Sequence, residues 1–551
     1  MKMGCPDSFS FISNYNCHLE AIGMLLSLSL HHPNSIVYGF VDDKTKIHIE
    51  KCVPKINLNL RLVSNLEKYK NKNRNQLCGS GEWSQFQMEK ANVIDYALKS
   101  SNDTMFLDSD IFILNKIYVD KNKDIGVSPH WTTKKITDQY GYYNGGVLWT
   151  KNKNTPKDWI EFTKKSRYYD QASIEDLVKK YSHYILGEEA NIGYWTVNFP
   201  YNSEKPDKLL SYIKDENNNI YYKGKPLQFI HAHIIEYNNK VNNKKDGMAL
   251  LITRVMNVLK KINRYKELMI MERMIQGKYI LGIPKQPRKN IWNHTDDSFR
   301  ELVTLIEKNN YDFKLERKDI NNCQLGENII LYDRPTLLWK DNNFTSKSLL
   351  LLGNGDINEE GKILSNQYNV PIIPWSFWPR NPIKLESFLE NINRKKFHER
   401  TNESIYIGNI ETNEQKQNRN NDWSKVITLF SLTNGTTHKF TQEQYLQHIS
   451  NSKYGLCLRG FGKKCHREVE LMAFGTVPLI TPNVNITSYL DPPKENIHFI
   501  RVNNPLDVKK KISDINSEKW EEMSKKCSEW FQKNVHSKNF MQNTLEHILY
   551  G

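Results

Sequence analysis

The chain has 551 residues, of which 38% are hydrophobic and 11% aromatic. This length allows two or three hydrophobic cores, and this composition excludes a disordered chain. The formal net charge of +15 favours anionic partners such as nucleotide diphosphates, acidic glycans or nucleic acid, although solvated surface lysine explains such an excess equally well.

The sequence shows no features of a secreted or membrane-spanning protein. No apolar run approaches the roughly 18–20 residues that a membrane-spanning helix needs. The first ten residues carry one Lys and no hydrophobic block, unlike a secretory signal. The eight Cys residues include no Cys-x-x-Cys pair, which is typical of reduced thiols rather than of a disulfide framework or a zinc site. We therefore expect a cytoplasmic protein without a transmembrane segment.

The N-terminal part, residues 1–240, alternates between short apolar runs and helical patterns. Residues 35–41 form a β-branched run, residues 83–99 have helical spacing, and residues 104–107 form another apolar run. A further strand is expected at 124–128. This rhythm predicts an α/β fold with a largely parallel sheet, which binds ligands at the carboxyl ends of its strands.

A charged, polar stretch over 238–246 precedes one long amphipathic helix predicted over 248–276. We interpret this helix as a connector between two domains; a dimerisation helix is the less economical alternative. A second α/β region follows, whose expected strands are 328–332, 348–352, 370–373, 404–408, 454–458 and 477–480, with a helical end over 518–549. The predicted division is a first domain over 1–240, a helical connector over 241–280 and a second domain over 281–551, itself split into halves 281–400 and 401–551.

Two carboxylates, Asp108 and Asp110, stand one residue apart at the end of the run over 104–107. Burying such charges costs several kcal/mol unless they are paired or bound to a metal. They are suitable ligands for Mn²⁺ or Mg²⁺, which would also hold the diphosphate of a nucleotide-sugar. Because a lone Asp-x-Asp is common, this prediction depends on the motifs that follow.

Three such motifs follow in order: Asn144-Gly145-Gly146, Asp170-Gln171 at the start of a helix, and His231-Ala-His233 at the end of a strand. Glycine lets the backbone approach a ligand closely. Taken singly, each motif has an ordinary explanation, such as a surface turn, a helix N-cap or a core histidine.

Together these motifs resemble glycosyltransferases of the GT-A type over about residues 5–240. The resemblance implies a metal ion held by the two aspartates, with His231 completing its shell and His233 as the alternative. It also implies that the Asn-Gly-Gly and Asp-Gln pairs line the sugar and acceptor pocket. The partners would be a nucleotide-sugar donor and a glycan or glycoprotein acceptor.

Sugar transfer also needs positive charge near the leaving diphosphate and, in an inverting enzyme, a carboxylate base. Lys90 and the Lys134-Lys135 pair are candidates for the charge. The candidate bases are Asp170, Glu188 and Glu189, and a retaining enzyme would need none of them there, so the stereochemistry stays open.

A second chemical pattern spans residues 452–480, where a strand leads through a basic, Gly-containing loop into a helix and then a second strand. Free backbone N–H groups at a helix N-terminus, together with basic side chains, bind phosphate. The candidate residues are Arg459, Gly460, Lys463 and Lys464 in the loop, and Arg467 and Glu470 on the helix, with Glu470 a possible partner of ribose or sugar hydroxyls. An ordinary βαβ unit with a solvated basic turn is the alternative.

This pattern resembles the donor-binding half of exostosin-like GT-B glycosyltransferases over about residues 400–500. There, an Arg-x-x-Glu helix followed by Gly-x-x-Pro binds the nucleotide-sugar, and Arg467, Glu470, Gly475 and Pro478 match in register. The loop after Gly408 would face the donor. GT-B sites generally need no metal.

The preferred hypothesis is therefore a bifunctional glycosyltransferase with one metal-dependent and one metal-independent site. The first alternative keeps one catalytic domain and makes the other a glycan- or nucleotide-binding module. The second alternative is a basic protein that binds nucleic acid. Against it, the Lys and Arg residues are spread along the chain, and no recognisable nucleic-acid-binding module is present. The abundance of Asn, Lys and Ile is typical of an AT-rich genome, such as that of a large DNA virus.

Overall fold

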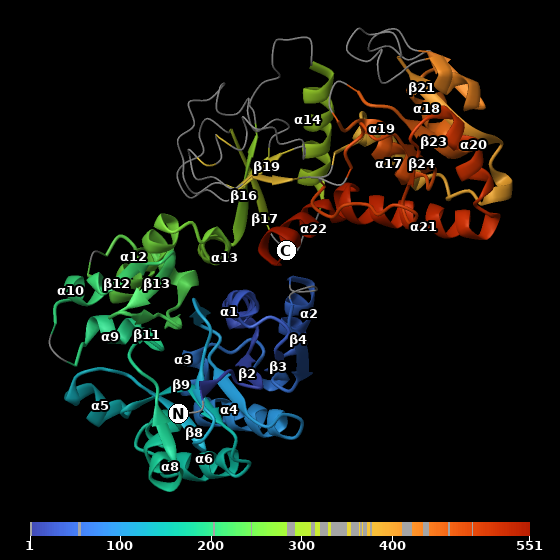
Figure 1. Cartoon of the computed structure of the whole chain (residues 1–551). Helices are drawn as coiled ribbons and strands as arrows, with labels where there is room; N and C mark the ends of the chain where they lie inside the picture. Colours follow the sequence, from blue (N-terminus) through green and yellow to red (C-terminus); the bar gives the residue numbers. More distant parts are fainter. Residues whose placement is uncertain are drawn as a thin grey trace. The chain divides into compact units, whose positions relative to one another are not determined.

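The computed structural model divides the chain into two compact units, essentially Met1–Tyr279 (unit 1) and Ile280–Leu549 (unit 2) (Figure 1). In the described part of the chain, we find no helix that combines the length and the apolarity needed to cross a membrane. The described residues are 3–52, 57–201, 204–243, 245–283, 293–309, 314–319, 329–331, 350–353, 363, 366, 372–374, 377–409, 421–432, 440–460, 463–486 and 489–550.

Unit 1 is built on a seven-stranded mixed sheet of order β10-β8-β9-β5-β2-β3-β4. Strands β5, β2, β3 and β4 are mutually parallel, whereas β9 runs antiparallel to both of its neighbours. The strands are β2 (Ser8–Ser13), β3 (Ile36–Val41), β4 (Asn59–Ser64), β5 (Thr104–Leu107), β8 (Ile125–Pro129), β9 (Tyr143–Thr150) and β10 (His183–Ile185). The α/β class predicted from the sequence is confirmed.

Helices cover both faces of this sheet (Figure 1). Apolar side chains of α4, α6 and α8 form one core with β2, β3, β5, β8 and β9. The helices of unit 1 are α1 (His18–His31), α2 (Asp43–Cys52), α3 (Arg74–Gly79), α4 (Trp83–Leu98), α5 (Lys134–Tyr140), α6 (Thr155–Thr163), α7 (Tyr169–Ala172), α8 (Ile174–Lys180), α9 (Tyr194–Asn198), α10 (Pro206–Ser211), α11 (Tyr237–Lys240), α12 (Gly247–Lys261) and α13 (Tyr265–Gln276).

Three small sheets complete unit 1. The one that matters for the site has the order β11-β15-β6, in which β15 is parallel to β11 and antiparallel to β6. Its strands are β6 (Ile111–Ile113), β11 (Asn191–Gly193) and β15 (Phe229–His231). The others pair β1 (Met3–Gly4) with β7 (Val119–Asp120), and β12 (Ile213–Glu216) with β13 (Asn219–Tyr222) and β14 (Lys225–Pro226).

The single helix predicted over 248–276 is wrong, because the structure has two helices, α12 and α13, separated by a turn. Asn263 adopts a left-handed backbone conformation with φ of 58°, which ends the first helix. The turn allows α12 to pack on α9 and α13 to pack on α1, so both helices belong to the core of unit 1. The assignment of residues 241–280 to a connector between two domains stays a prediction.

Unit 2 contains two five-stranded sheets, of order β17-β16-β18-β19-β20 and β22-β21-β23-β24-β25, and every strand pairing described in detail is parallel. The first sheet has β16 (Lys278–Ile283), β17 (Lys314–Asp319), β18 (Ile329–Leu331), β19 (Leu350–Gly353) and β20 (Ile372–Pro374). The second has β21 (Asn402–Gly408), β22 (Leu429–Leu432), β23 (Ser452–Cys457), β24 (Val477–Ile480) and β25 (Ile500–Arg501). Much of the predicted half 281–400 lies outside the described residues.

The helices of unit 2 are α14 (Asn293–Lys308), α17 (Pro382–Glu390), α18 (Gln442–Ser450), α19 (His466–Ala473), α20 (Pro505–Ser513), α21 (Ser517–Asn534) and α22 (Ser537–Tyr550). The helix α19 connects β23 to β24, as the sequence predicts for a βαβ unit. All six strands expected in this region overlap observed strands. The predicted helical end of the chain is observed as α21 and α22.

Candidate functional site

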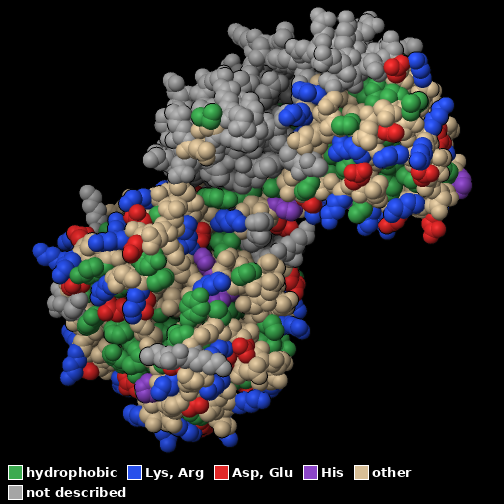
Figure 2. All heavy atoms as spheres, viewed as in Figure 1, with side chains coloured by type: hydrophobic (Ala, Val, Ile, Leu, Met, Phe, Trp, Pro, Cys, Tyr) green, Lys and Arg blue, Asp and Glu red, His purple; other side chains and the backbone are tan. Residues whose placement is uncertain are grey.

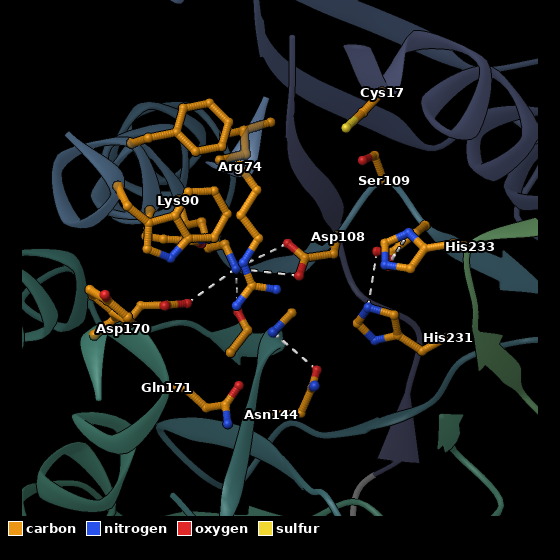
Figure 3. A pocket seen from close by; sticks show the side chains of 18 of the residues that line it. Cys17, Arg74, Lys90, Asp108, Ser109, Asn144, Asp170, Gln171, His231 and His233 are labelled. Atoms are coloured by element: carbon orange, nitrogen blue, oxygen red, sulfur yellow. Dashed lines mark hydrogen bonds and ion pairs between the residues drawn. The ribbon is translucent and has the colours of Figure 1, made fainter. Parts of the chain in front are cut away.

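A cavity of about 650 Å³ lies in unit 1 at the carboxyl ends of β2 and β5 (Figure 3). The antiparallel strand β9 begins at the same edge of the sheet, so its first residues join the wall. The cavity collects residues that are far apart in sequence, including Asp108, Asp110, Asn144, Asp170 and His231. The structure thus brings most of the predicted unit 1 residues into one place.

Backbone hydrogen bonds position the two aspartates. The N–H of Asp108 donates to the carbonyl of Gly146 at 2.9 Å, and the carbonyl of Asp110 accepts from the N–H of Ala232 at 3.0 Å. The first bond ties the acidic turn to β9, and the second ties it to the end of β15. Both carboxylates are therefore presented by a turn that is fixed on two sides.

His231 completes a cluster of three potential metal ligands. One ligand atom from each of Asp108, Asp110 and His231 lies within 4.8 Å of the other two. The Nε2 atom of His231 is 2.9 Å from Oδ1 of Asp110, and its Nδ1 atom is buried without a hydrogen-bond partner among the described residues. Two carboxylates and an imidazole are a donor set suited to Mn²⁺.

Gly146 is the residue that makes this cluster possible. A Cβ atom at this position would lie 2.4 Å from Oδ2 of Asp108 and 2.6 Å from Cε1 of His231. Any side chain larger than hydrogen would therefore displace one of the candidate ligands. The close approach expected for the Asn-Gly-Gly motif is thus used by the candidate metal ligands.

His233, the alternative ligand, lies between Asp110 and a glutamate that the sequence did not single out. Its Nδ1 atom is 3.1 Å from Oε1 of Glu20 and 3.4 Å from Oδ2 of Asp110. Burial lowers the pKa of His233, but Asp110 and Glu20 outweigh this effect and raise it to about 10. Burial also raises the pKa of Glu20 above its ordinary value. A charged residue inside the apolar helix α1 is the signal that could have identified Glu20.

Lys90 forms the centre of the opposite wall, as Figure 3 shows. Its Nζ atom lies 3.1 Å from Oδ1 of Asp108, 3.1 Å from Oδ2 of Asp170 and 3.2 Å from the carbonyl of Gly145. Burial alone would lower the pKa of Lys90, but the two carboxylates raise it above its ordinary value. Lys90 therefore remains charged, with its donors directed at three protein oxygens.

Asp170 reaches the cavity from a strained segment. The preceding residue, Tyr169, has φ of 41°, which is unusual for a residue other than glycine. Trp159 Nε1 donates to the carbonyl of Asp170 at 2.9 Å. The helix begins at Tyr169, so Asp170 lies in its first turn and is not the N-cap. Its carboxylate is directed into the cavity by backbone geometry.

Two further predicted residues shape the same wall. Asn144 Oδ1 accepts from the N–H of Gly146 at 3.0 Å, and Asn144 Nδ2 lies 3.2 Å from Nε2 of His130. Burial lowers the pKa of His130 to about 4, so this ring is neutral at pH 7. Gln171 lines the cavity, and its Nε2 donates to the carbonyl of Tyr140 at 2.9 Å.

Two of the candidate bases are not brought to the cavity. Glu188 accepts from Tyr201 OH at 2.9 Å and pairs with Lys223 at 2.6 Å, while Glu189 pairs with Lys225 at 3.3 Å. Neither glutamate lines the cavity, and neither does the exposed Lys134-Lys135 pair in α5. Asp170 is therefore the one predicted base that the structure places with the aspartate pair.

Two predicted residues of unit 2, Arg467 and Gly408, lie together at the carboxyl end of β21. Arg467, on α19, donates from Nη2 to the carbonyl of Ile407 at 2.5 Å, and its guanidinium lies 4.5 Å from the ring centre of Tyr406. A Cβ atom at Gly408 would lie 2.5 Å from Nη2 of Arg467. Arg459, Gly460 and Lys463 lie in the loop that connects β23 to α19.

Glu470 has a different environment from the one expected for a ribose-binding residue. It is 3% exposed, with Oε1 accepting from the N–H of Arg380 at 2.8 Å and Oε2 accepting from Tyr445 OH at 2.7 Å. Both carboxylate oxygens are thus engaged by the protein. We interpret Glu470 as a residue that stabilises the packing of α19.

Several cavity residues could not be recognised from the sequence. Aromatic side chains from separate segments line the walls, among them Trp83, Phe86, Tyr168, Tyr194 and Trp195. They come from α4, from the residue before α7 and from α9, which are distant in sequence, so no local motif relates them. Arg74, at the start of α3, is a further residue of this kind.

No protein-family model and no curated protein matches the sequence. Among solved structures, the chain is similar to the galactosyltransferase LgtC in complex with donor and acceptor sugar analogues, with 12% identity, a TM-score of 0.30, and coverage of 41% of this chain and 86% of that chain. It is also similar to the glycosyltransferase GlyE of Streptococcus pneumoniae, with 10% identity, a TM-score of 0.31, and coverage of 93% and 98%. The bifunctional glycosyltransferase WbbM gives 12% identity, a TM-score of 0.30, and coverage of 48% and 52%.

Proposed function

We propose that unit 1 is a metal-dependent glycosyltransferase domain, which moves a sugar from a nucleotide-diphosphate donor to a hydroxyl of a glycan or glycoprotein. The proposal is supported by one observation above all, the convergence of Asp108, Asp110 and His231 in the cavity. The volume of about 650 Å³ falls in the range of small-molecule sites. The cavity also lies at the carboxyl ends of parallel strands, where α/β folds bind their ligands.

Asp108, Asp110 and His231 would hold Mn²⁺ or Mg²⁺, with His233 and Glu20 fixing the orientation of Asp110. When bound, the metal supplies positive charge against the diphosphate. The donor set favours Mn²⁺, because an imidazole nitrogen accompanies the carboxylates.

The protein's own side chains have separate tasks in this proposal. Lys90 holds the carboxylates of Asp108 and Asp170 at a fixed separation and neutralises part of their charge. Asp170 is the candidate base for the acceptor hydroxyl if the reaction inverts the anomeric centre. Asn144 holds the backbone of Gly146 against the aspartates, and Gln171 lines the adjacent wall.

A screen of nucleotide-sugars for hydrolysis and transfer, with and without Mn²⁺, tests the proposal. We expect metal-dependent release of nucleoside diphosphate from one donor, and loss of that release in Asp110→Asn. Asp95→Asn is the matched control, because Asp95 is an exposed carboxylate on α4 that pairs with Lys99. Turnover that is independent of metal, or equal in Asp110→Asn, would refute the proposal.

We propose a second, metal-independent nucleotide-sugar site in unit 2, which would make the chain bifunctional. The specific support is Arg467, whose guanidinium is held at the carboxyl end of β21 beside the basic loop that leads into α19. Metal-independent donor binding that is lost in Arg467→Gln, while the unit 1 reaction is unchanged, would support two sites. Loss of all transfer in Asp110→Asn alone would instead leave unit 2 as a binding module.

The nucleic-acid alternative has less support. On the face shown in Figure 2, Lys and Arg side chains of the described residues are interspersed with Asp and Glu. A nucleic-acid site would require a basic stripe or patch along one face.

A further inference from the structure

Among the residues that the structure describes, one cation on the cavity wall has no carboxylate partner. Among the described residues, the Lys and Arg side chains that line the cavity are Lys72, Arg74 and Lys90. The Nζ atom of Lys72 is 2.6 Å from a carboxylate oxygen of Glu82, and Lys90 is held by the buried carboxylate of Asp170 and the partly exposed carboxylate of Asp108. For Arg74, no described Asp or Glu oxygen lies within ion-pair distance. Arg74 is thus the cation of this wall that is available for a ligand.

Neutral groups hold Arg74 in position without cancelling its charge. It is the first residue of α3, whose N-cap Asn73 forms a capping box with Gln76. Its guanidinium lies 5.2 Å from the ring centre of Trp83, and its Nη2 atom donates to Tyr168 OH at 3.3 Å. Figure 3 shows the side chain extending from α3 into the cavity.

The charge of the cavity calls for such a group. Five carboxylates line it, those of Glu20, Asp108, Asp110, Asp170 and Glu236. An anionic ligand that enters this environment needs positive charge beyond one divalent ion. Lys90 cannot supply it freely, because its Nζ already lies within hydrogen-bonding distance of three protein oxygens.

We propose that Arg74 binds the diphosphate of the donor and stabilises it as it leaves; this inference rests on the glycosyltransferase function proposed for unit 1. In the transfer, the bond between the anomeric carbon and the diphosphate oxygen breaks, and its electron pair leaves with the nucleoside diphosphate. The acceptor oxygen bonds to the anomeric carbon, and its proton passes to a base. The planar guanidinium offers paired donors that match phosphate oxygens, and charge-assisted bonds of this kind are strong.

Binding of nucleoside diphosphates, measured by titration calorimetry with MnCl₂, tests this role without turnover. The probes are uridine, guanosine, adenosine and thymidine diphosphates, each compared with its monophosphate. We expect Arg74→Gln to weaken binding of the preferred diphosphate by about tenfold or more, and Arg74→Lys to have an intermediate effect. The preference for diphosphate over monophosphate should shrink in parallel.

Lys70→Gln is the charge-matched control. Lys70 precedes α3 by a few residues, pairs with Glu67 at 3.3 Å and does not line the cavity. It should bind diphosphates like the wild type, and thermal melts should show that all variants are folded.

The outcomes separate the two proposals. If the wild type binds no nucleoside diphosphate with Mn²⁺, the glycosyltransferase function fails, and the role of Arg74 fails with it. If the wild type binds one and Arg74→Gln binds it equally well, only the role of Arg74 is overturned. A variant that binds diphosphate normally but has a raised KM for an anionic acceptor would assign Arg74 to the acceptor instead.

Discussion

Replacing Gly146 with alanine tests the candidate metal cluster while leaving every proposed ligand in the chain. The added Cβ atom would lie 2.4 Å from Oδ2 of Asp108, whereas real Cβ contacts essentially never fall below 3.0 Å. The carboxylate must therefore move by about 0.6 Å and the ring of His231, 2.6 Å from the same Cβ atom, by about 0.4 Å. Misplacement of reacting groups by 1 Å costs about 100-fold in rate, so we expect Gly146→Ala to lose about 10- to 100-fold in metal-dependent turnover.

The same change should cost little in folding. Overpacking a well-packed site costs about 1–3 kcal/mol, so a chemical melt should show a folded protein with moderately reduced stability. Gly79→Ala is the matched control, because a Cβ atom at the C-terminal residue of α3 would meet nothing within 4 Å. Turnover and Mn²⁺ affinity that are unchanged in Gly146→Ala would show that the three side chains do not act on a shared ion.

Three further predictions concern stability. Lys90→Met leaves the buried carboxylate of Asp170 and the partly exposed one of Asp108 without their partner, so urea melts should show a loss of about 3–5 kcal/mol, part of which Mn²⁺ restores; an unchanged midpoint would contradict the ion-pair geometry. Burial lowers the pKa of His32 from 6.5 to about 4. Between pH 4 and pH 6.5, His32 is therefore protonated in the unfolded chain and neutral in the folded one. The wild type should therefore lose up to about 3 kcal/mol as pH falls through that window, and His32→Gln should show a flatter pH profile. Glu470→Gln replaces one of two engaged acceptors with a donor and should lower stability by about 1–3 kcal/mol, whereas an unchanged melting temperature with lost donor binding would favour a ribose contact.

The fold was predictable to the extent that it depends on local patterns. The alternation of apolar runs and helical spacing predicted the main strands near the site, because a strand buried on both faces is read directly from its composition. The break at Asn263 was missed, because apolar spacing continues on both sides of one residue in a left-handed conformation. The spacing of apolar residues shows which face of a helix is buried. It does not reveal a turn between two helices whose buried faces continue the same spacing.

The candidate bases show why site residues are harder to assign. Glu188 and Glu189 stand just before β11, which is parallel to β15 and pairs Gly193 with His231. They therefore lie at the amino end of β11, whereas His231 lies at the carboxyl end of β15. The rule that ligands bind at carboxyl ends would have excluded both glutamates once β11 was recognised as a strand. Such a short strand carries too little pattern to be recognised alone.

Glu470 shows a related ambiguity. Arg467 and Glu470 are one helical turn apart, so the motif predicts that they share a face of α19, as the structure shows. It does not predict whether that face meets a ligand or the protein. In the structure Tyr445 and the backbone of Arg380, from two other segments, donate to the carboxylate of Glu470, and no local pattern relates these segments to α19.

The position of Lys90 bears on how unit 1 tolerates its acidic cavity in the absence of metal. Asp108 follows β5 and Asp170 lies in α7. Both carboxylates would be costly to bury as isolated charges. A buried ammonium within 3.1 Å of each carboxylate offsets that cost in the folded chain. Because Lys90 contacts Asp108 and not Asp110, the second aspartate depends on His231 and His233 instead. Each candidate metal-binding carboxylate thus has its own cationic or hydrogen-bonding support, which positions both before any metal binds and reduces the reorganisation that binding requires.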